Sequence, residues 1–152
     1  MDRARLNRCL EPGTSILVGT AGPAGIPSCC RGIAIESRDE FETVTVYLPV
    51  ATSHETIHNL ATTKRLAVVA THPRDNFATQ FKGTTAEARL AREDEEAFVR
   101  ARLDAFADVL DRIGVPRRLT RTMAHWPAFA VTMRVEQVFD QTPGPNAGSR
   151  VR

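Results

Sequence analysis

Two histidines and a glutamate in the first half of the chain have the spacing of a zinc site. The segment His54-Glu55-Thr56-Ile57-His58 places two imidazoles one helical turn apart, with a carboxylate between them. In one class of zinc hydrolases, both imidazoles bind the metal and the glutamate activates water. The remaining histidines, His72 and His125, lie outside the extended spacing that supplies a third ligand. A zinc site is therefore an alternative that needs support from elsewhere.

The same residues also match the start of a helix. Thr52-Ser53-His54-Glu55 has the pattern of a capping box, in which Glu55 bonds back to the backbone of Thr52. The pattern predicts a short helix that ends near Thr62. We expect this helix start and no metal site, while a non-catalytic metal or ligand role for His54 and His58 stays open.

Three other side chains are candidates for ligand contact. Arg31 follows Cys30 in an apolar strand, where a charge needs a partner or a path to solvent. It is either a contact to a ligand phosphate or an exposed strand arginine. Tyr47 faces away from its apolar neighbours, towards a cleft or a subunit interface. Trp126 either covers a ligand or closes one end of the fold.

Several common site patterns are missing from the sequence. Of the three cysteines, Cys29 and Cys30 are adjacent, which suits neither a disulfide framework nor a zinc site, so we expect buried or half-buried thiols. No spacing places a base beside a nucleophile, and no glycine-rich phosphate loop occurs. The sequence therefore assigns no catalytic side chain.

The composition indicates one globular domain. The 152 residues are 42% hydrophobic and 25% charged, with a net charge of +2 spread along the chain, so nucleic acid is a poor candidate partner. The first residues, Met1 to Asn7, hold charges without an apolar run, and no apolar segment is long enough for a membrane span. We expect a cytoplasmic protein.

Hydrophobic patterns along the chain predict six strands and two helices. The short helix at 52–62 follows the third strand, and a helix from 93 with a stripe from Phe98 to Ile113 precedes the last strand. The apolar run 66–70 is expected to be buried on both faces, and Gly83 is expected at a bulge or a close backbone approach. The expected strands are 15–19, 28–36, 43–48, 66–70, 79–90 and 129–135. This order predicts a mainly β fold, a six-stranded antiparallel split β-barrel with helices.

The same segments resemble the pyridoxamine 5′-phosphate oxidase-like FMN-binding split barrels over residues 15–139. The resemblance is carried by Gly25-Ile26-Pro27, by Val46-Tyr47-Leu48 leading to Ser53 and Asn59-Leu60, by Lys64-Arg65-Leu66, and by Gln80-Phe81-Lys82-Gly83 before Ala86-Glu87. The ending Phe139-Asp140-Gln141-Thr142-Pro143 is similar to that of a bacterial subgroup. We therefore divide the chain into an FMN-binding split-barrel domain, 1–141, and a Pro/Gly-rich tail, 142–152.

The resemblance implies a homodimer with FMN in the cleft between subunits. It places one set of residues along the ring and ribityl chain, a second set around the phosphate, and Thr79 or Gln80 with Lys82 near the ring or phosphate. Carried over by position, the set along the ring and ribityl chain is Arg31, Gly32, Ile33 and Ala34. The set around the phosphate is Leu48, Pro49, Ser53, His54 and Thr56. Relatives usually carry Arg or Lys after the helix-start serine, where this chain has His54 and Glu55. Glu55 therefore weakens phosphate binding if it points inward.

The sequence thus predicts an FMN-binding flavoprotein, a flavin-dependent oxidoreductase acting on a small-molecule substrate that remains unassigned. In that reaction the cofactor supplies the redox chemistry and the protein supplies orientation and charge. A non-catalytic flavin- or haem-binding split barrel is the alternative, and a zinc site at His54-Glu55-Thr56-Ile57-His58 is a weaker one.

Overall fold

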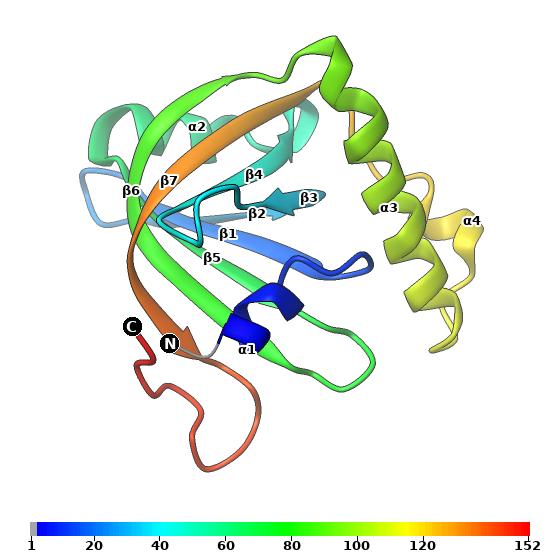
Figure 1. Ribbon diagram of the computed structural model, residues 1–152. Coiled ribbons are helices and arrows are strands. Elements are labelled where there is room, and N and C mark those ends of the chain that lie inside the picture. The colour runs from blue at the N-terminus through cyan, green and yellow to red at the C-terminus, as the bar shows by residue number, and fades with distance from the viewer. Residues whose placement is uncertain (1–2) are drawn as a thin grey trace.

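The computed structural model describes residues 3–152 as a curled sheet with helices around it (Figure 1). The sheet contains seven strands. The helical elements are α1 (Arg3–Arg8), η1 (Val50–Thr52), α2 (His54–Thr63), η2 (Glu93–Glu95), α3 (Glu96–Asp111) and α4 (Arg117–Thr120). The strands are β1 (Ser15–Ala21), β2 (Pro27–Gly32), β3 (Ala34–Glu36), β4 (Thr43–Pro49), β5 (Arg65–Thr71), β6 (Ala78–Leu90) and β7 (Ala128–Asp140).

The seventh strand arises because the predicted strand 28–36 breaks at Ile33. The sheet order is β2-β1-β5-β6-β7-β4-β3, so β2 and β3 form its two edges although one residue separates them in sequence. The Ile33 N–H donates to the Tyr47 carbonyl at 2.9 Å, which ties the crossing point to β4. A Cβ on Gly32 would lie 2.7 Å from Ile16 Cγ2, so the close approach of β2 and β1 requires glycine. The crossing segment therefore joins both edges and closes the sheet into a split barrel.

The barrel interior is filled by alternating side chains of the strands. Val18, Val46, Val68, Phe81 and Val131 are fully buried there, and each contributes about 1.5–3 kcal/mol relative to an exposed position. The prediction that 66–70 is buried on both faces is wrong, because β5 alternates between buried and half-buried residues. Its second face lies on the outside of the barrel, where no helix covers it.

The β6–β7 pairing confirms both expectations for Gly83. The register shifts between Lys82 and Gly83, which is a bulge, and a Cβ on Gly83 would lie 1.8 Å from the Arg134 carbonyl oxygen. The bulge bends the two longest strands of the sheet, β6 and β7, around the barrel.

Helix α3 covers a second, smaller core on one side of the barrel (Figure 1). Val99 and Leu103 pack there against Tyr47, Ala34 and Ala130. The helix is at the expected place, but its buried stripe is Val99, Leu103, Phe106 and Val109, whereas Ala101 and Ile113 of the expected stripe are exposed. Tyr47 therefore lies under α3, 1% exposed, and not in a cleft.

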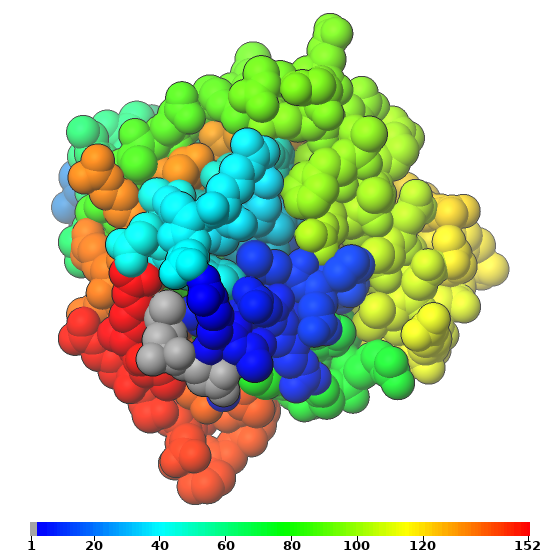
Figure 2. All heavy atoms as spheres, in the orientation of Figure 1, coloured from blue at the N-terminus to red at the C-terminus, as the bar shows by residue number. Residues whose placement is uncertain are grey.

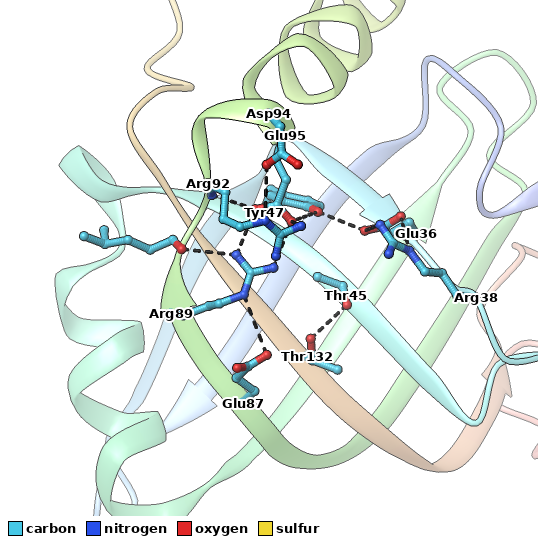
Figure 3. A network of polar contacts seen from close by, with 11 residues as sticks. Glu36, Arg38, Thr45, Tyr47, Glu87, Arg89, Arg92, Asp94, Glu95 and Thr132 are labelled. Atoms are coloured by element: carbon cyan, nitrogen blue, oxygen red, sulfur yellow. Dashed lines mark hydrogen bonds and ion pairs between the residues drawn. The ribbon is translucent and has the colours of Figure 1, made fainter.

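A polar network fixes the start of α3 to the sheet (Figure 3). Both Glu95 carboxylate oxygens accept hydrogen bonds from Arg89, at 2.8 Å each, and Glu95 also accepts from the Arg92 N–H at 2.7 Å. The Tyr47 hydroxyl lies 2.9 Å from Glu36 Oε1 and 3.0 Å from Glu95 Oε1, with one proton to donate. Burial and these two carboxylates raise the pKa of Tyr47. The hydrogen bond from Arg89 lowers the pKa of the Glu95 carboxyl to about 2, although burial opposes this shift.

Two terminal segments complete the molecule. Helix α1, which the sequence analysis did not predict, inserts the fully buried Leu6 into the main core. The C-terminal segment folds back on β7, with the Val151 N–H donating to the Val138 carbonyl at 2.8 Å. Figure 2 shows it beside the segment before β4, where Arg152 donates to the Phe41 carbonyl at 2.8 Å. Within residues 3–152, no helix has both the length and the apolar character needed to cross a bilayer.

Candidate functional site

The outer surface of strands β2, β1, β5 and β6 forms a face, which we call the outer face, and Phe106 of α3 lies against Arg31 at its β2 end. Two rows of residues cross it in register. One row is Arg31, Leu17, Val69 and Gln80, and the other is Cys29, Gly19, Ala67 and Lys82. The centre of the face is apolar, with Leu17 42% exposed, and the rows end in polar or charged side chains. At about 4.8 Å per strand, Arg31 and Gln80 are about 14 Å apart.

A cavity of about 420 Å³ opens at the β2 end of this face. Strand β2 contributes Cys29, Cys30 and Arg31, the crossing residue Ile33 also lines the cavity, and the entry to η1 contributes Pro49 and Thr52. The loop before β7 closes it with Met123 and Ala124. We call this the β2–η1 cavity. Its walls are mostly apolar, and Arg31 is the one charged residue among those that line it.

Arg31 is the chemically distinctive side chain of this cavity. Its Nη1 donates to the Ser15 hydroxyl at 3.0 Å, and its guanidinium carbon lies 5.6 Å from the centre of the Phe106 ring. Across residues 3–152, no carboxylate oxygen lies within ion-pair distance of it, although the side chain is half-buried. A guanidinium has five N–H donors, so most of its hydrogen-bonding capacity faces the cavities around it. The structure thus orients a positive charge whose natural complement is an anion.

The predicted site residues divide into three groups. Arg31, Ile33 and Pro49 line the β2–η1 cavity together. Gln80 and Lys82 lie on the outer face of β6, at the far side of the sheet, and the Lys82 ammonium lies 4.7 Å from the centre of the Phe139 ring. The remaining predicted residues line neither place: Gly32, Ala34, Leu48, Ser53 and Thr56 are buried, and His54 is exposed.

The start of α2 differs from the predicted capping box. The residue that precedes the first helical residue is Ser53, not Thr52, and the Ser53 hydroxyl donates to the Pro49 carbonyl at 2.7 Å instead of capping the helix. The reason is that Val50–Thr52 forms a turn of 3-10 helix directly before α2, which shifts the helix start by one residue. Glu55 remains in the first turn of the helix and is exposed.

The zinc-like motif lies on the surface of α2. His54, Glu55 and His58 are all exposed, and the described residues hold no group of three or more His, Cys, Asp or Glu side chains placed to bind a metal. A zinc hydrolase requires such a group, and the described residues do not assemble one around His54 and His58.

The three cysteines have different surroundings. Cys29 is exposed and lines both the β2–η1 cavity and a wide hollow of about 610 Å³ on the outer face. Cys30 and Cys9 are buried, as expected, and burial raises the pKa of both, but the expectation of a buried or half-buried thiol is wrong for Cys29. The Cys29 thiol is therefore the one that a reagent in solution reaches.

Sequence reasoning missed part of the cavity wall. Met123 and Ala124 belong to a loop between α4 and β7, more than 70 residues after Pro49. Neither residue belongs to a periodic pattern or a motif, so only the folded structure shows that they line the cavity. Trp126 packs against the second core beside Met123 and does not line the cavity.

Comparison with solved structures identifies the fold. The model of the chain matches an F420 reductase with a TM-score of 0.56 at 12% identity, covering 87% of this chain and 94% of that one. It matches a relative of general stress protein 26, of the pyridoxinephosphate oxidase family, from Clostridium acetobutylicum, with a TM-score of 0.54 at 16% identity, covering 91% of this chain and 88% of that one. It also matches an FMN-binding protein from Syntrophomonas wolfei, with a TM-score of 0.53 at 8% identity, covering 90% of this chain and 81% of that one.

Comparison with protein-family models and with curated proteins gives no match. At these identities the structural matches establish the fold alone. They confirm the predicted split barrel, with the same arrangement as proteins of the pyridoxinephosphate oxidase family.

Proposed function

We propose that this chain is a pyridoxamine 5′-phosphate oxidase-like flavoprotein that binds FMN in the β2–η1 cavity and acts as an oxidoreductase. The observation that carries the proposal is Arg31, a half-buried guanidinium without a carboxylate partner in the described structure, at the edge of an apolar cavity. A cation in this position stabilises the negative charge that a flavin ring gains on reduction. The fold shared with an FMN-binding protein and an F420 reductase supports a flavin-type ligand.

The cavity suits the ring of a flavin better than its phosphate. Its volume of about 420 Å³ falls within the roughly 300–1,000 Å³ of small-molecule sites, and Ile33, Pro49 and Met123 offer apolar contact to a flat ring. The Ile33 N–H is already bonded to Tyr47 and is not free to bond the ring. The nearby start of α2 has the exposed Glu55 and no lysine or arginine in its first turn. FMN binding therefore needs a cation from elsewhere for its phosphate.

A homodimer supplies the missing groups and covers the outer face. Leu17, Val69 and Ala67 form an apolar centre of the kind that subunit interfaces bury. Across the sheet of one subunit, Gln80 is about 14 Å from Arg31 at the backbone, and Lys82 belongs to the neighbouring row, in register with Cys29. A second copy packed on this face brings its own Gln80 and Lys82 towards the cavity. We therefore propose that Lys82 of the partner subunit supplies the cation.

In this arrangement the bound flavin supplies hydride or electron transfer. Arg31 holds charge at the ring edge, while Ile33, Pro49 and Met123 orient the ring and exclude water from one face. No side chain needs to act as a nucleophile. The substrate is a small molecule, and the cytoplasm is the proposed location.

An FMN titration followed by flavin fluorescence tests the proposal. We expect Arg31→Gln to weaken binding by roughly tenfold or more, the size of one charge-assisted contact. Arg38→Gln is the matched control, because Arg38 is an exposed arginine that pairs only with Glu36 in the described structure. Equal affinities of wild type and Arg31→Gln would overturn the site. NAD(P)H bleaching of the bound flavin distinguishes an enzyme from a protein that only binds the cofactor.

Light scattering of Leu17→Glu tests the dimer. A buried carboxylate without a partner opposes association, so we expect a monomer with weakened FMN binding. A monomer that still binds FMN as tightly as wild type would contradict a site shared between subunits.

A further inference from the structure

A second cavity, of about 360 Å³, adjoins the β2–η1 cavity on the side of α3. Helix α3 forms one wall with Phe106 and Leu110, and the turn between β5 and β6 forms the other with Pro73 and Asn76. We call it the α3 cavity. Arg31 and Met123 line both cavities, so the two compartments meet at the guanidinium.

The lining of the α3 cavity selects one charge type. Arg31 is the one charged residue that lines it, and no aspartate or glutamate is among the lining residues. The hydroxyls of Ser15 and Thr71 and the amide of Asn76 add neutral polar groups near the guanidinium. This set repels a metal ion and favours an organic anion, which a guanidinium can bind through two parallel hydrogen bonds.

The guanidinium is held in place before any ligand arrives. The Ser15 hydroxyl accepts from Nη1 at 3.0 Å, and the Phe106 ring, 8% exposed, lies 5.6 Å from the guanidinium carbon. These two contacts hold the group from two chain segments, β1 and α3. A fixed donor pair loses little entropy on binding, and this favours a small ligand in a small cavity.

Phe106, Leu110 and Met123 give the ligand an apolar wall opposite these polar groups. We propose that the α3 cavity binds the organic substrate, a carboxylate with a compact apolar body, with its carboxylate on Arg31. The inference rests on the proposed flavin site, because the shared Arg31 is what brings such a substrate next to the cofactor. The substrate class is thus a carboxylate with a compact apolar body, which matches the polar and apolar walls of the α3 cavity.

The experiment uses benzoate as the probe and benzyl alcohol as its neutral counterpart, titrated into the full-length, ¹⁵N-labelled, flavin-free protein. We expect benzoate to shift the amide signals of residues 71–72, 74–76 and 106–110 and to bind roughly tenfold or more tightly than benzyl alcohol. Equal binding of the two probes, or no shift in these segments, would overturn the inference.

Two leucine variants provide the matched comparison. Leu110→Glu places a carboxylate in the wall of the α3 cavity, and we expect benzoate binding to weaken at least tenfold. Leu119→Glu makes the same change on α4, at a leucine that is 55% exposed and lines neither cavity, and should bind benzoate as wild type does. If both variants bind like wild type, the α3 cavity is not the binding site.

An FMN titration on the same samples separates this inference from the proposed function. Benzoate binding at the α3 cavity in a chain that does not take up FMN would overturn the flavin proposal and the assignment as substrate, while the anion site itself would stand. FMN binding without selective benzoate binding would overturn the inference alone.

Discussion

Replacing Glu95 by glutamine tests whether the polar network under α3 stabilises the fold. The Glu95 side chain is 7% exposed and accepts two hydrogen bonds from Arg89 and one from the Arg92 N–H, and its Oε1 lies 3.0 Å from the Tyr47 hydroxyl (Figure 3). The variant keeps the shape of the side chain but removes its charge. The guanidinium of Arg89 then loses its short ion pair with Glu95 and keeps the longer one with Glu87, at 3.7 Å, and one amide group must replace a carboxylate that accepts three hydrogen bonds from Arg89 and the Arg92 N–H.

The expected loss follows from the pKa of Glu95. The carboxyl has a pKa of about 2 in the folded protein against an ordinary 4.5, and a difference of this size corresponds to about 3 kcal/mol. Arg89 is 29% exposed, so solvent screening reduces the expected loss to about 2–3 kcal/mol at pH 7. Because the folded pKa is depressed, this contribution is present above pH 4.5 and is lost as the pH falls towards 2.

Urea unfolding followed by the fluorescence of Trp126, the single tryptophan of the chain, measures the effect. The difference between wild type and Glu95→Gln should be largest at neutral pH and should shrink between pH 4.5 and 2. Glu96→Gln is the control, since its pair with Arg100 is an exposed contact between successive helical turns, and we expect it to cost less than about 0.5 kcal/mol. A loss for Glu95→Gln as small as the control, or one independent of pH, would refute the reasoning.

Three further predictions follow from individual residues. Glu55→Lys replaces an exposed carboxylate in the first turn of α2 by a cation and should strengthen FMN binding by roughly threefold to tenfold; Glu93→Lys, far from the cavity, should leave the affinity unchanged in the same fluorescence titration. Gly83→Ala should lower the free energy of unfolding, measured in urea, by about 2 kcal/mol or more, because the new Cβ collides with a backbone carbonyl. Gly19→Ala is the control, because the space around Gly19 is open. A comparable loss in Gly19→Ala would show the steric argument to be wrong. In the Leu17→Glu variant, whose outer face is uncovered, iodoacetamide should modify one thiol per folded chain, at Cys29, as peptide mass spectrometry can determine; rapid modification of a buried cysteine would contradict the described packing.

Strand alternation was sufficient to predict the barrel but not its closure. The residues of β4 and β7 alternate between interior and exterior as expected, and Gly83 lies at the expected bulge. The break at Ile33 was not predictable, because residues 28–36 read as one continuous strand and the break depends on contacts with β1 and β4. The prediction that the second face of β5 is buried is wrong, because an apolar run has the same sequence pattern whether its second face is buried or half-exposed.

The candidate site was predictable only where one residue type indicates its own chemistry. Arg31 was identifiable because a charged side chain inside an apolar strand needs a partner. Thr52, Met123 and Ala124 were not, because small and apolar side chains of loops and short turns line a cavity without any sequence signal. Tyr47 is expected in a cleft or at a subunit interface, because the pattern cannot show that α3 folds over this part of β4.

The absorption spectrum of the purified protein, before and after incubation with FMN, tests the central proposal most directly. We predict the visible bands of a bound flavin, with one flavin per chain after gel filtration and a large loss of that absorbance in Arg31→Gln. A colourless protein that takes up no FMN, or one that shows the Soret band of haem instead, would contradict the proposal that the β2–η1 cavity is a flavin site.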